Sequence, residues 1–240
     1  MFNDINMSTV FKFKQFEVDQ TGCAMKINTD GVLLAALLES ESPKNILDIG
    51  TGTGVLALMM AQRFTSAKVT AVEIDELASA TAGRNFQKSA FGKRLAINNV
   101  AIEQFITAQK FDLIISNPPF FVNDLKNTEE KKGIARHTSE QFFANLIVKV
   151  NAILANDGRF WFILPIKQAE LLIKYALENG LFPAKRIELH SDQFKPAFRW
   201  IVCLDRRNFE TKIEQFYIYE SEKNYTKAYK ELLKDFFLGY

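Results

Sequence analysis

The sequence predicts an α/β fold in which a seven-stranded, mostly parallel sheet is flanked by helices. From residue 45 onward, short apolar runs rich in Val, Ile and Phe alternate with longer segments whose apolar residues recur three and four positions apart. This alternation is typical of successive strand–helix–strand units. The chain also has 240 residues, of which 48% are hydrophobic and 24% charged, which is enough for one sizeable core of ordinary soluble composition.

The expected elements follow one another from residue 45. Five apolar runs are predicted as parallel strands and two later runs as a closing hairpin: 45–50, 68–74, 95–98, 111–116 and 159–164, then 184–190 and 198–204. Helices are predicted at 55–64, 76–88, 141–155 and 168–178. The tail adds an alternating stretch at 215–220 and an amphipathic helix at 227–237, whose aromatic face we expect to cover the sheet or a neighbouring helix.

An N-terminal segment, residues 1–44, precedes this pattern. Phe11 to Lys14 alternate like a half-exposed strand, and a loop then leads into an apolar helix from Val32, with Thr29 or Asp30 as its expected cap. We expect one domain over 1–240: the N-terminal segment covering a ligand site, a core at 45–204, and a C-terminal strand and helix at 205–240.

Composition and charge narrow the functional classes. The net charge of +2 gives no bulk evidence for a nucleic-acid partner, so that claim needs local basic patches. No apolar run approaches the roughly 20 residues that span a bilayer, and the N-terminus does not read as a signal peptide, so we expect a cytoplasmic protein. Cys23 and Cys203 lie far apart without metal-type neighbours, which predicts buried thiols and no metal site.

A glycine-rich loop follows the first core strand. The segment 46–54, ILDIGTGTG, is placed at the carboxyl edge of the sheet, where open α/β folds bind ligands. The dinucleotide fingerprint would need a third glycine where Val55 stands, so a nicotinamide dehydrogenase is disfavoured. Asp48, followed by Gly50, Gly52 and Gly54, resembles instead the first motif of class I methyltransferases that use S-adenosylmethionine.

Two more strand ends are expected at the same edge. Glu73, at the end of the second strand, can accept both ribose hydroxyls of an adenosyl cofactor, whereas Asp75 is better placed to cap the next helix. Methyltransferases of this class usually place an acid just after the third strand, near the adenine, but Ala101 stands here. Either Glu103 reaches round, or backbone groups of Ala101 and Ile102 contact the adenine.

The fourth strand ends in a rigid polar corner, Asn117-Pro118-Pro119-Phe120. The prolines fix the backbone and remove two amide donors, so carbonyl oxygens are left to accept hydrogen bonds. An exocyclic amino nitrogen is a poor nucleophile because its lone pair is delocalised into the ring. Hydrogen bonds to Asn117 and to the Pro118 carbonyl would localise that pair, and Phe120 would stack on the base. The corner is therefore predicted to align an amino group with a methyl donor, with Asn117 touching both.

The N-terminal segment narrows the choice of amino group. Residues 11–16 (FKFKQF), 23–26 (CAMK) and 29–34 (TDGVLL), together with 47–54 and 115–120, resemble the bacterial tRNA1(Val) (adenine(37)-N6)-methyltransferase family over most of the chain. The resemblance implies a Rossmann-like class I fold, S-adenosyl-L-methionine as cofactor, and the N6 amino group of tRNA adenine, A37 of tRNA1(Val), as acceptor. It also implies that Lys26, Thr29 and Asp30 contact the cofactor.

Basic residues expected near the corner are candidate contacts to RNA phosphates: Lys12, Lys14, Arg136, Lys195 and Arg199. Two alternative functions stay open. One is methylation of guanine N2 in ribosomal RNA, by enzymes that share the corner but often carry a second, degenerate domain. The other is a catalytically silent RNA-binding or scaffolding module of the same fold. A monomer is favoured.

Overall fold

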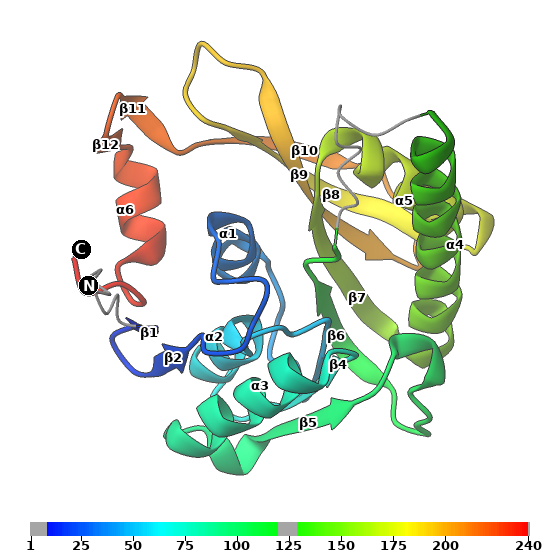
Figure 1. Cartoon of the computed structure of the whole chain (residues 1–240). Helices are drawn as coiled ribbons and strands as arrows, with labels where there is room; N and C mark the ends of the chain where they lie inside the picture. Colours follow the sequence, from blue (N-terminus) through cyan, green and yellow to red (C-terminus); the bar gives the residue numbers. More distant parts are fainter. Residues whose placement is uncertain (1–8, 120–128, 240) are drawn as a thin grey trace.

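One large sheet organises the chain (Figure 1). The computed structural model describes residues 9–119 and 129–239, and describes only the backbone of residues 129–139. The strands of this sheet are β3 (Asn45–Ile49), β4 (Lys68–Glu73), β5 (Leu95–Asn99), β6 (Phe111–Ser116), β7 (Leu154–Leu164), β8 (Phe182–His190), β9 (Ala197–Asp205) and β10 (Lys212–Tyr217). They lie in the order β10-β8-β9-β7-β6-β3-β4-β5. The predicted α/β class is confirmed.

The sheet is mostly parallel. Neighbouring strands from β5 through to β7 pair in parallel, and β9 pairs antiparallel with both β7 and β8, so the predicted closing hairpin forms. The sheet has eight strands rather than the predicted seven, because β10 adds in parallel to the free edge of β8. This edge strand is half exposed, so its sequence carries only a weak strand signal.

Helices cover both faces of the sheet. On one face pack α1 (Thr29–Leu37), α2 (Val55–Arg63), α3 (Glu76–Lys88) and α6 (Lys227–Leu233), and on the other pack α4 (Glu129–Ile153) and α5 (Ile166–Glu178). Side chains of β6 alternate between the two cores, with Leu113 and Ile115 in the first and Ile114 in the second, as a pleated strand requires. Within the described ranges no helix is long and apolar enough to cross a membrane.

The helices α4 and α6 differ most from their predicted ranges. α4 begins at Glu129, well before the predicted start at residue 141, because its first turns are rich in charge and carry little apolar periodicity. α6 ends at Leu233 rather than residue 237. Short 3-10 turns, Gly92–Arg94 and Ile102–Gln104, flank β5.

The described N-terminal and C-terminal segments meet on the α1 and α2 side. The strands β1 (Val10–Lys12) and β2 (Glu17–Asp19) form a small hairpin, and Phe13 in its connection pairs with Phe237 after α6. A second small ribbon, β11 (Tyr219–Ser221) with β12 (Asn224–Tyr225), precedes α6. The tail therefore covers helices of the core, and the ring of Phe237 lies 5.6 Å from that of Phe13.

The N-cap of α1 corrects the prediction. The helix begins at Thr29, and its cap is Asn28, whose side chain accepts a hydrogen bond of 2.9 Å from the Gly31 amide. The expected cap was Thr29 or Asp30, and that prediction was wrong because the helix starts at Thr29, three residues before its apolar run begins at Val32. Asp30 instead forms an ion pair of 2.8 Å with Arg199 in β9.

Candidate functional site

A pocket of about 310 Å³ lies at the carboxyl edge of the sheet. The ends of β3, β4, β5 and β6 form its floor, residues 23–25 of the N-terminal segment lie on one side, and Phe142 of α4 contributes from another. Its volume falls at the lower end of the roughly 300–1,000 Å³ typical of small-molecule sites. The glycine loop, Glu73 and the Asn-Pro-Pro corner all reach this one pocket.

The glycine loop forms an open cradle. The amides of Gly50 and Thr51 donate to the Val72 carbonyl at 2.9 and 3.2 Å, which fixes the loop against β4. Gly50 and Gly52 adopt φ values of +70° and +56°, and a β-carbon added to either would meet no atom within 4 Å. Both glycines line the pocket, so open space lies in front of the loop where a ligand can approach the backbone closely.

Glu73 ends β4 beside this cradle. Its side chain is largely buried, and its Oε2 and Oε1 accept hydrogen bonds from the Gly52 amide at 2.8 Å and the Asp75 amide at 2.9 Å. A carboxylate offers about four acceptor positions, so these two bonds orient the group and leave capacity on each oxygen. This arrangement suits a pair of vicinal hydroxyls.

Asp48 and Gly54 support the loop from behind and do not line the pocket. Asp48 is fully buried, and its Oδ2 accepts from the Thr51 hydroxyl and, at 3.1 Å, from the Ala57 amide. Burial raises the pKa of the Asp48 carboxyl to about 7. At Gly54, whose φ is +85°, a β-carbon would lie 2.6 Å from the Phe86 ring. Both residues therefore shape the loop.

Hydrogen bonds join the polar corner to the strand end before the glycine loop and to the N-terminal segment. The Ser116 hydroxyl donates to the Ile49 carbonyl at 2.9 Å, which ties the end of β6 to the end of β3. Asn117 then directs its Nδ2 to Asn28 Oδ1 at 3.5 Å. Because Asn117, Pro118 and Pro119 all line the pocket, an acceptor group held at the corner would face a ligand held by the loop.

Comparison with known proteins agrees with this geometry. The profile of the methyltransferase small domain family matches residues 23–181, a range that contains the glycine loop, Glu73 and the corner. A Pedobacter heparinus protein named tRNA1(Val) (adenine(37)-N6)-methyltransferase is 55% identical over 98% of this chain and 100% of its own length. The chain belongs to this methyltransferase family. An Actinobacillus pleuropneumoniae protein of the same name is 37% identical over 95% of this chain and 97% of its own length.

Solved structures support the methyltransferase fold. A crystal structure described as a predicted O-methyltransferase from Agrobacterium tumefaciens superposes with a TM-score of 0.66 at 18% identity, covering 86% of this chain and 96% of that one. At this identity the likeness concerns the fold alone. The α/β arrangement is that of class I methyltransferases, as the sequence predicted.

S-adenosylmethionine is the methyl donor of this methyltransferase family, and the pocket fits it. The open cradle at Gly50 and Gly52 suits the amino-acid portion, and the oriented carboxylate of Glu73 suits the ribose. Between β4 and β5 the pocket wall is mostly apolar, as an adenine ring requires, with Ile74 and Val100 in its lining.

The adenine end of the site has no acid directly after β5. Ala101, Ile102 and Glu103 all line the pocket there. The Ala101 carbonyl already accepts a hydrogen bond of 3.0 Å from the Gln104 amide, and the Ile102 side chain is buried in the core. The exposed Glu103 carboxylate is therefore placed to accept from an amino group in this pocket, while Ala101 and Ile102 offer backbone contacts.

Several residues that line the pocket are not among the predicted site residues, including Cys23, Met25, Ile74 and Phe142. Ile74 directly follows Glu73, so its place at the strand end was available as a signal, whereas Phe142 comes from α4 and had no local signal. Burial raises the pKa of the Cys23 thiol, which keeps the thiol protonated. Among the described residues, no cluster of three or more His, Cys, Asp or Glu side chains could hold a metal ion.

The structure places Lys26, Thr29 and Asp30 beside the pocket rather than in its lining. Lys26 and Thr29 are exposed. Asp30 Oδ2 accepts from Arg199 Nε at 2.8 Å, an ion pair that joins the start of α1 to β9. Cofactor contact by these three residues stays a proposal from the resemblance.

The candidate RNA contacts are spread over the molecule. Lys12, which pairs with Glu17 at 3.4 Å, and Lys14, which donates to the Lys234 carbonyl, lie on the small hairpin near α6 (Figure 1), so neither lines the pocket. Lys195 lies in the turn between β8 and β9 and pairs with Asp192 at 3.1 Å. The Phe120 position and the Arg136 side chain are outside the part that the structure describes.

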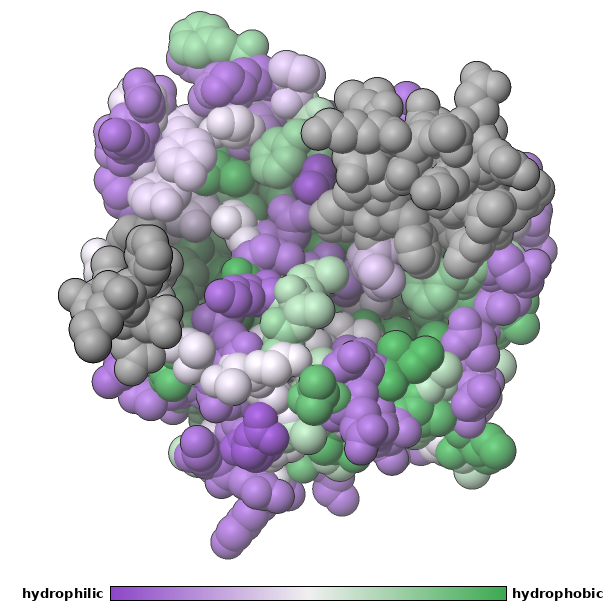
Figure 2. Space-filling model, viewed as in Figure 1, coloured by the Kyte–Doolittle hydropathy of each residue, from purple (hydrophilic) through white to green (hydrophobic). Residues whose placement is uncertain are grey.

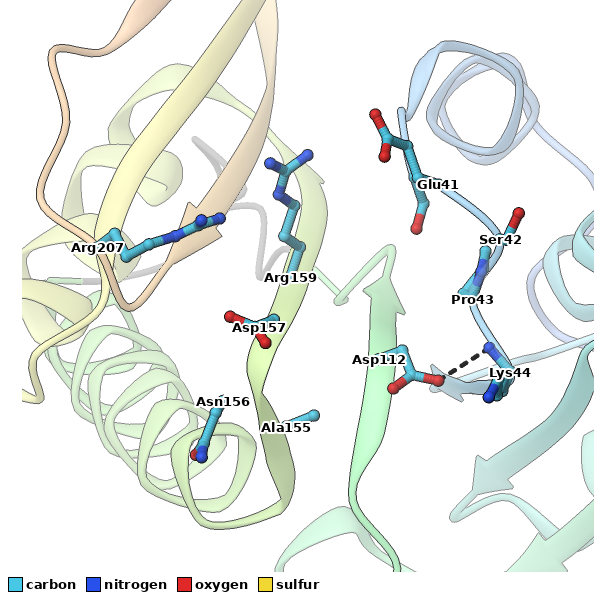
Figure 3. Close-up of a pocket in the computed structure, with 11 residues that line it drawn as sticks. Glu41, Ser42, Pro43, Lys44, Asp112, Ala155, Asn156, Asp157, Arg159 and Arg207 are labelled. Carbon is cyan, nitrogen blue, oxygen red and sulfur yellow. Dashed lines mark hydrogen bonds between the residues drawn. The ribbon is translucent and has the colours of Figure 1, made fainter.

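A larger cavity, about 570 Å³, lies at the opposite, amino edge of the sheet (Figure 3). Arg159 and Arg207 face it from one side and Glu41 from the other, and the Lys44 amide donates to Asp112 at 2.8 Å. Both arginines pair with the buried Asp205, at 3.4 and 2.8 Å. The two arginines thus share a single buried carboxylate and are held by an ion pair of the fold, and the described residues at this edge form no glycine loop, so the carboxyl-edge pocket is the better candidate site.

Proposed function

We propose that this chain transfers the methyl group of S-adenosylmethionine to the exocyclic N6 amino group of an adenine in tRNA, with A37 of tRNA1(Val) as the first candidate. The observation that carries the proposal is the corner at the end of β6, where Asn117 and Pro118 line the same pocket as the glycine cradle and Glu73. The names of the relatives, among them one that is 55% identical over nearly the whole chain, support this choice of substrate.

The chemistry follows from the acceptors at the corner. S-adenosylmethionine, when bound, supplies an electrophilic methyl group on a sulfonium. Asn117 donates from Nδ2 toward Asn28, so its Oδ1 is the terminal atom that accepts an N6 proton, and the Pro118 carbonyl accepts the other. These bonds localise the lone pair of the nitrogen and aim it at the methyl carbon. Such alignment can lower the activation free energy by roughly 7 kcal/mol or more.

We further propose how the substrate base and the rest of the chain take part. Phe120 would stack on a base that has left its helix or lies in a loop. Residues 1–240 would work as one unit, with the N-terminal segment over the cofactor. The residues proposed for the site all come from one chain, so a monomer is favoured, and the cytoplasm, where tRNA is processed, is the expected compartment.

The alternatives receive less support. A silent module would not need the cradle, the oriented Glu73 and the corner to converge on one pocket. Guanine N2 methylation in ribosomal RNA shares the corner chemistry, but the relatives that match across nearly the whole chain are named for tRNA adenine.

One experiment tests the substrate directly. The purified chain is incubated with methyl-labelled cofactor and total tRNA from a strain that lacks the corresponding gene, and the modified nucleoside is mapped by mass spectrometry. The proposal expects N6-methyladenosine at position 37 of tRNA1(Val). Label in guanine, in ribosomal RNA only, or in protein would overturn it.

A further inference from the structure

The turn between β8 and β9, residues 191–196, carries an unusually exposed aromatic ring. Phe194 is 84% exposed, and Phe198, at the start of β9, is 36% exposed. The turn rises above the carboxyl edge of the sheet (Figure 1), and Figure 2 shows apolar surface at the same place at the top of the view. A large apolar side chain with this much exposed surface is available to a partner.

Strand order places this turn on the acceptor side of the corner. The cofactor strands β3, β4 and β5 lie on one side of β6, and β7, β9 and β8 lie on the other. Ser116 pairs with Phe162, which pairs in turn with Val202. Ser116, Phe162 and Val202 thus lie in one row across the sheet. Because β9 runs antiparallel to β7, Phe198 lies past this row toward the carboxyl edge, the same edge at which Asn117 follows Ser116. Two strand spacings, roughly 10 Å, separate β6 from β9 within the sheet.

A chain of contacts joins the base of the turn to the corner. Arg199, next to Phe198, pairs with Asp30 at 2.8 Å, and Asp30 lies in the first turn of α1. The cap of that helix, Asn28, accepts from Asn117 at 3.5 Å. The aromatic turn and the reacting corner are therefore fixed relative to one another through the start of α1.

The turn is also ordered internally. Asp192 accepts from the Phe194 amide at 3.0 Å and pairs with Lys195 at 3.1 Å. His190 Nδ1 bonds the Lys195 carbonyl at 2.8 Å. These bonds hold the backbone with Phe194 pointing outward, so little ordering entropy is lost when the ring meets a partner.

We propose that Phe194 and Phe198 form a stacking surface for unpaired RNA bases next to the nucleotide that enters the corner. The inference rests on the proposed function, since it assigns the RNA-facing side of that same site. A base that enters the pocket leaves its neighbours without a stacking partner, and aromatic rings in ordered positions replace it. The Lys195 side chain on the same turn is exposed, and it could exchange its Asp192 partner for a phosphate of such a loop.

The experiment measures binding of a fluorescent stem-loop RNA, with adenine in its loop, by anisotropy. Phe194→Ala should weaken binding by about tenfold, the loss typical of one base-stacking ring. Phe194→Trp should restore binding, because the stacking face returns.

The matched control is Phe209→Ala. Phe209 is 55% exposed between β9 and β10 at the opposite edge of the sheet, and this variant should bind the RNA as the wild type does. Calorimetry with S-adenosylmethionine should give unchanged affinity for all three variants.

Several outcomes overturn the inference. One is that Phe194→Ala binds the RNA as tightly as the wild type does. Another is that Phe194→Ala and Phe209→Ala lose equal RNA affinity. A third is that the wild type binds no stem-loop RNA. A wild-type dimer that Phe194→Ala dissociates in light scattering, with RNA binding unchanged, would assign the surface to a second copy of the chain instead. If the wild type binds the RNA but methylates none, the proposed function fails while the Phe194 comparison still decides this inference.

Discussion

Asn117 Nδ2 donates to Asn28 Oδ1 at 3.5 Å, and the same oxygen caps α1 by accepting from the Gly31 amide at 2.9 Å. One side chain of the N-terminal segment therefore both starts a helix and orients the amide at the corner. Gly31 lies between this pair and α2: a β-carbon there would lie 2.8 Å from the end of the Leu56 side chain, which would have to shift, and in ordinary contact with Asn117 Nδ2 at 3.6 Å.

Asn28→Ala should lower kcat for methyl transfer about tenfold while the affinity for S-adenosylmethionine changes little, because the Asn117 amide loses the partner that orients it. Loss of the cap should also reduce the unfolding free energy by about 1 kcal/mol. Asn28→Asp keeps an acceptor for both bonds and should recover most of kcat. Steady-state kinetics and urea unfolding separate the two effects. A purely structural cap would show the stability loss in Asn28→Ala with kcat unchanged.

Glu73→Gln should weaken S-adenosylmethionine binding tenfold or more, because charge-assisted bonds to the ribose hydroxyls become neutral ones. Glu103→Gln should have a smaller effect, since Glu103 is exposed at the adenine end. Glu76→Gln, at an exposed position on α3 outside the pocket, is the control. Titration calorimetry gives the three affinities, and equal affinities for Glu73→Gln and Glu76→Gln would remove Glu73 from the cofactor site.

Gly52→Ala and Gly54→Ala should fail in different ways. A β-carbon on Gly52 enters open pocket space, so this variant should fold with a modest loss of stability and bind cofactor poorly. A β-carbon on Gly54 would lie 2.6 Å from the Phe86 ring, so this variant should lose several degrees in Tm. Thermal unfolding with and without S-adenosylmethionine distinguishes the two. If the cofactor stabilises Gly52→Ala as much as it stabilises the wild type, the cofactor does not lie close to the backbone at Gly52.

Stability should depend on the Asp48 carboxyl between about pH 4 and 7. Burial raises its pKa from the usual 3.8 to about 7, so in this window the unfolded chain loses a proton that the folded chain keeps. Ionisation then favours the unfolded state, and the contribution that is complete below pH 4 is lost as the pH rises through 7, by a few kcal/mol at most. Asp48→Asn should flatten this part of the profile in urea unfolding from pH 4 to 8. An identical slope in both proteins would assign it to other groups.

The sequence predicted the core and the strand ends well, because both depend on local patterns. Alternating apolar residues at 111–116 predict a buried strand, and the glycine loop, Glu73 and the corner each follow such a strand, so their convergence on one edge follows from the parallel topology. Asp75 caps α3, as expected. These features need no knowledge of distant contacts.

Features that depend on distant parts of the chain were not predictable in the same way. Phe142 reaches the pocket from a helix on the other face of the sheet, and Arg199 pairs with Asp30 across 169 residues of sequence. Asn28 was missed as the cap because the apolar run of α1 begins at Val32, whereas the helix starts at Thr29. In each case tertiary packing decides a contact that no local pattern records.

The central claim is that Asn117 activates the acceptor nitrogen without being needed for the fold. It is tested by single-turnover methyl transfer to tRNA1(Val) with saturating S-adenosylmethionine, comparing the wild type with Asn117→Ala. The account predicts a loss of at least a hundredfold in the rate, with cofactor affinity and Tm close to those of the wild type. A rate within a few fold of the wild type would contradict it.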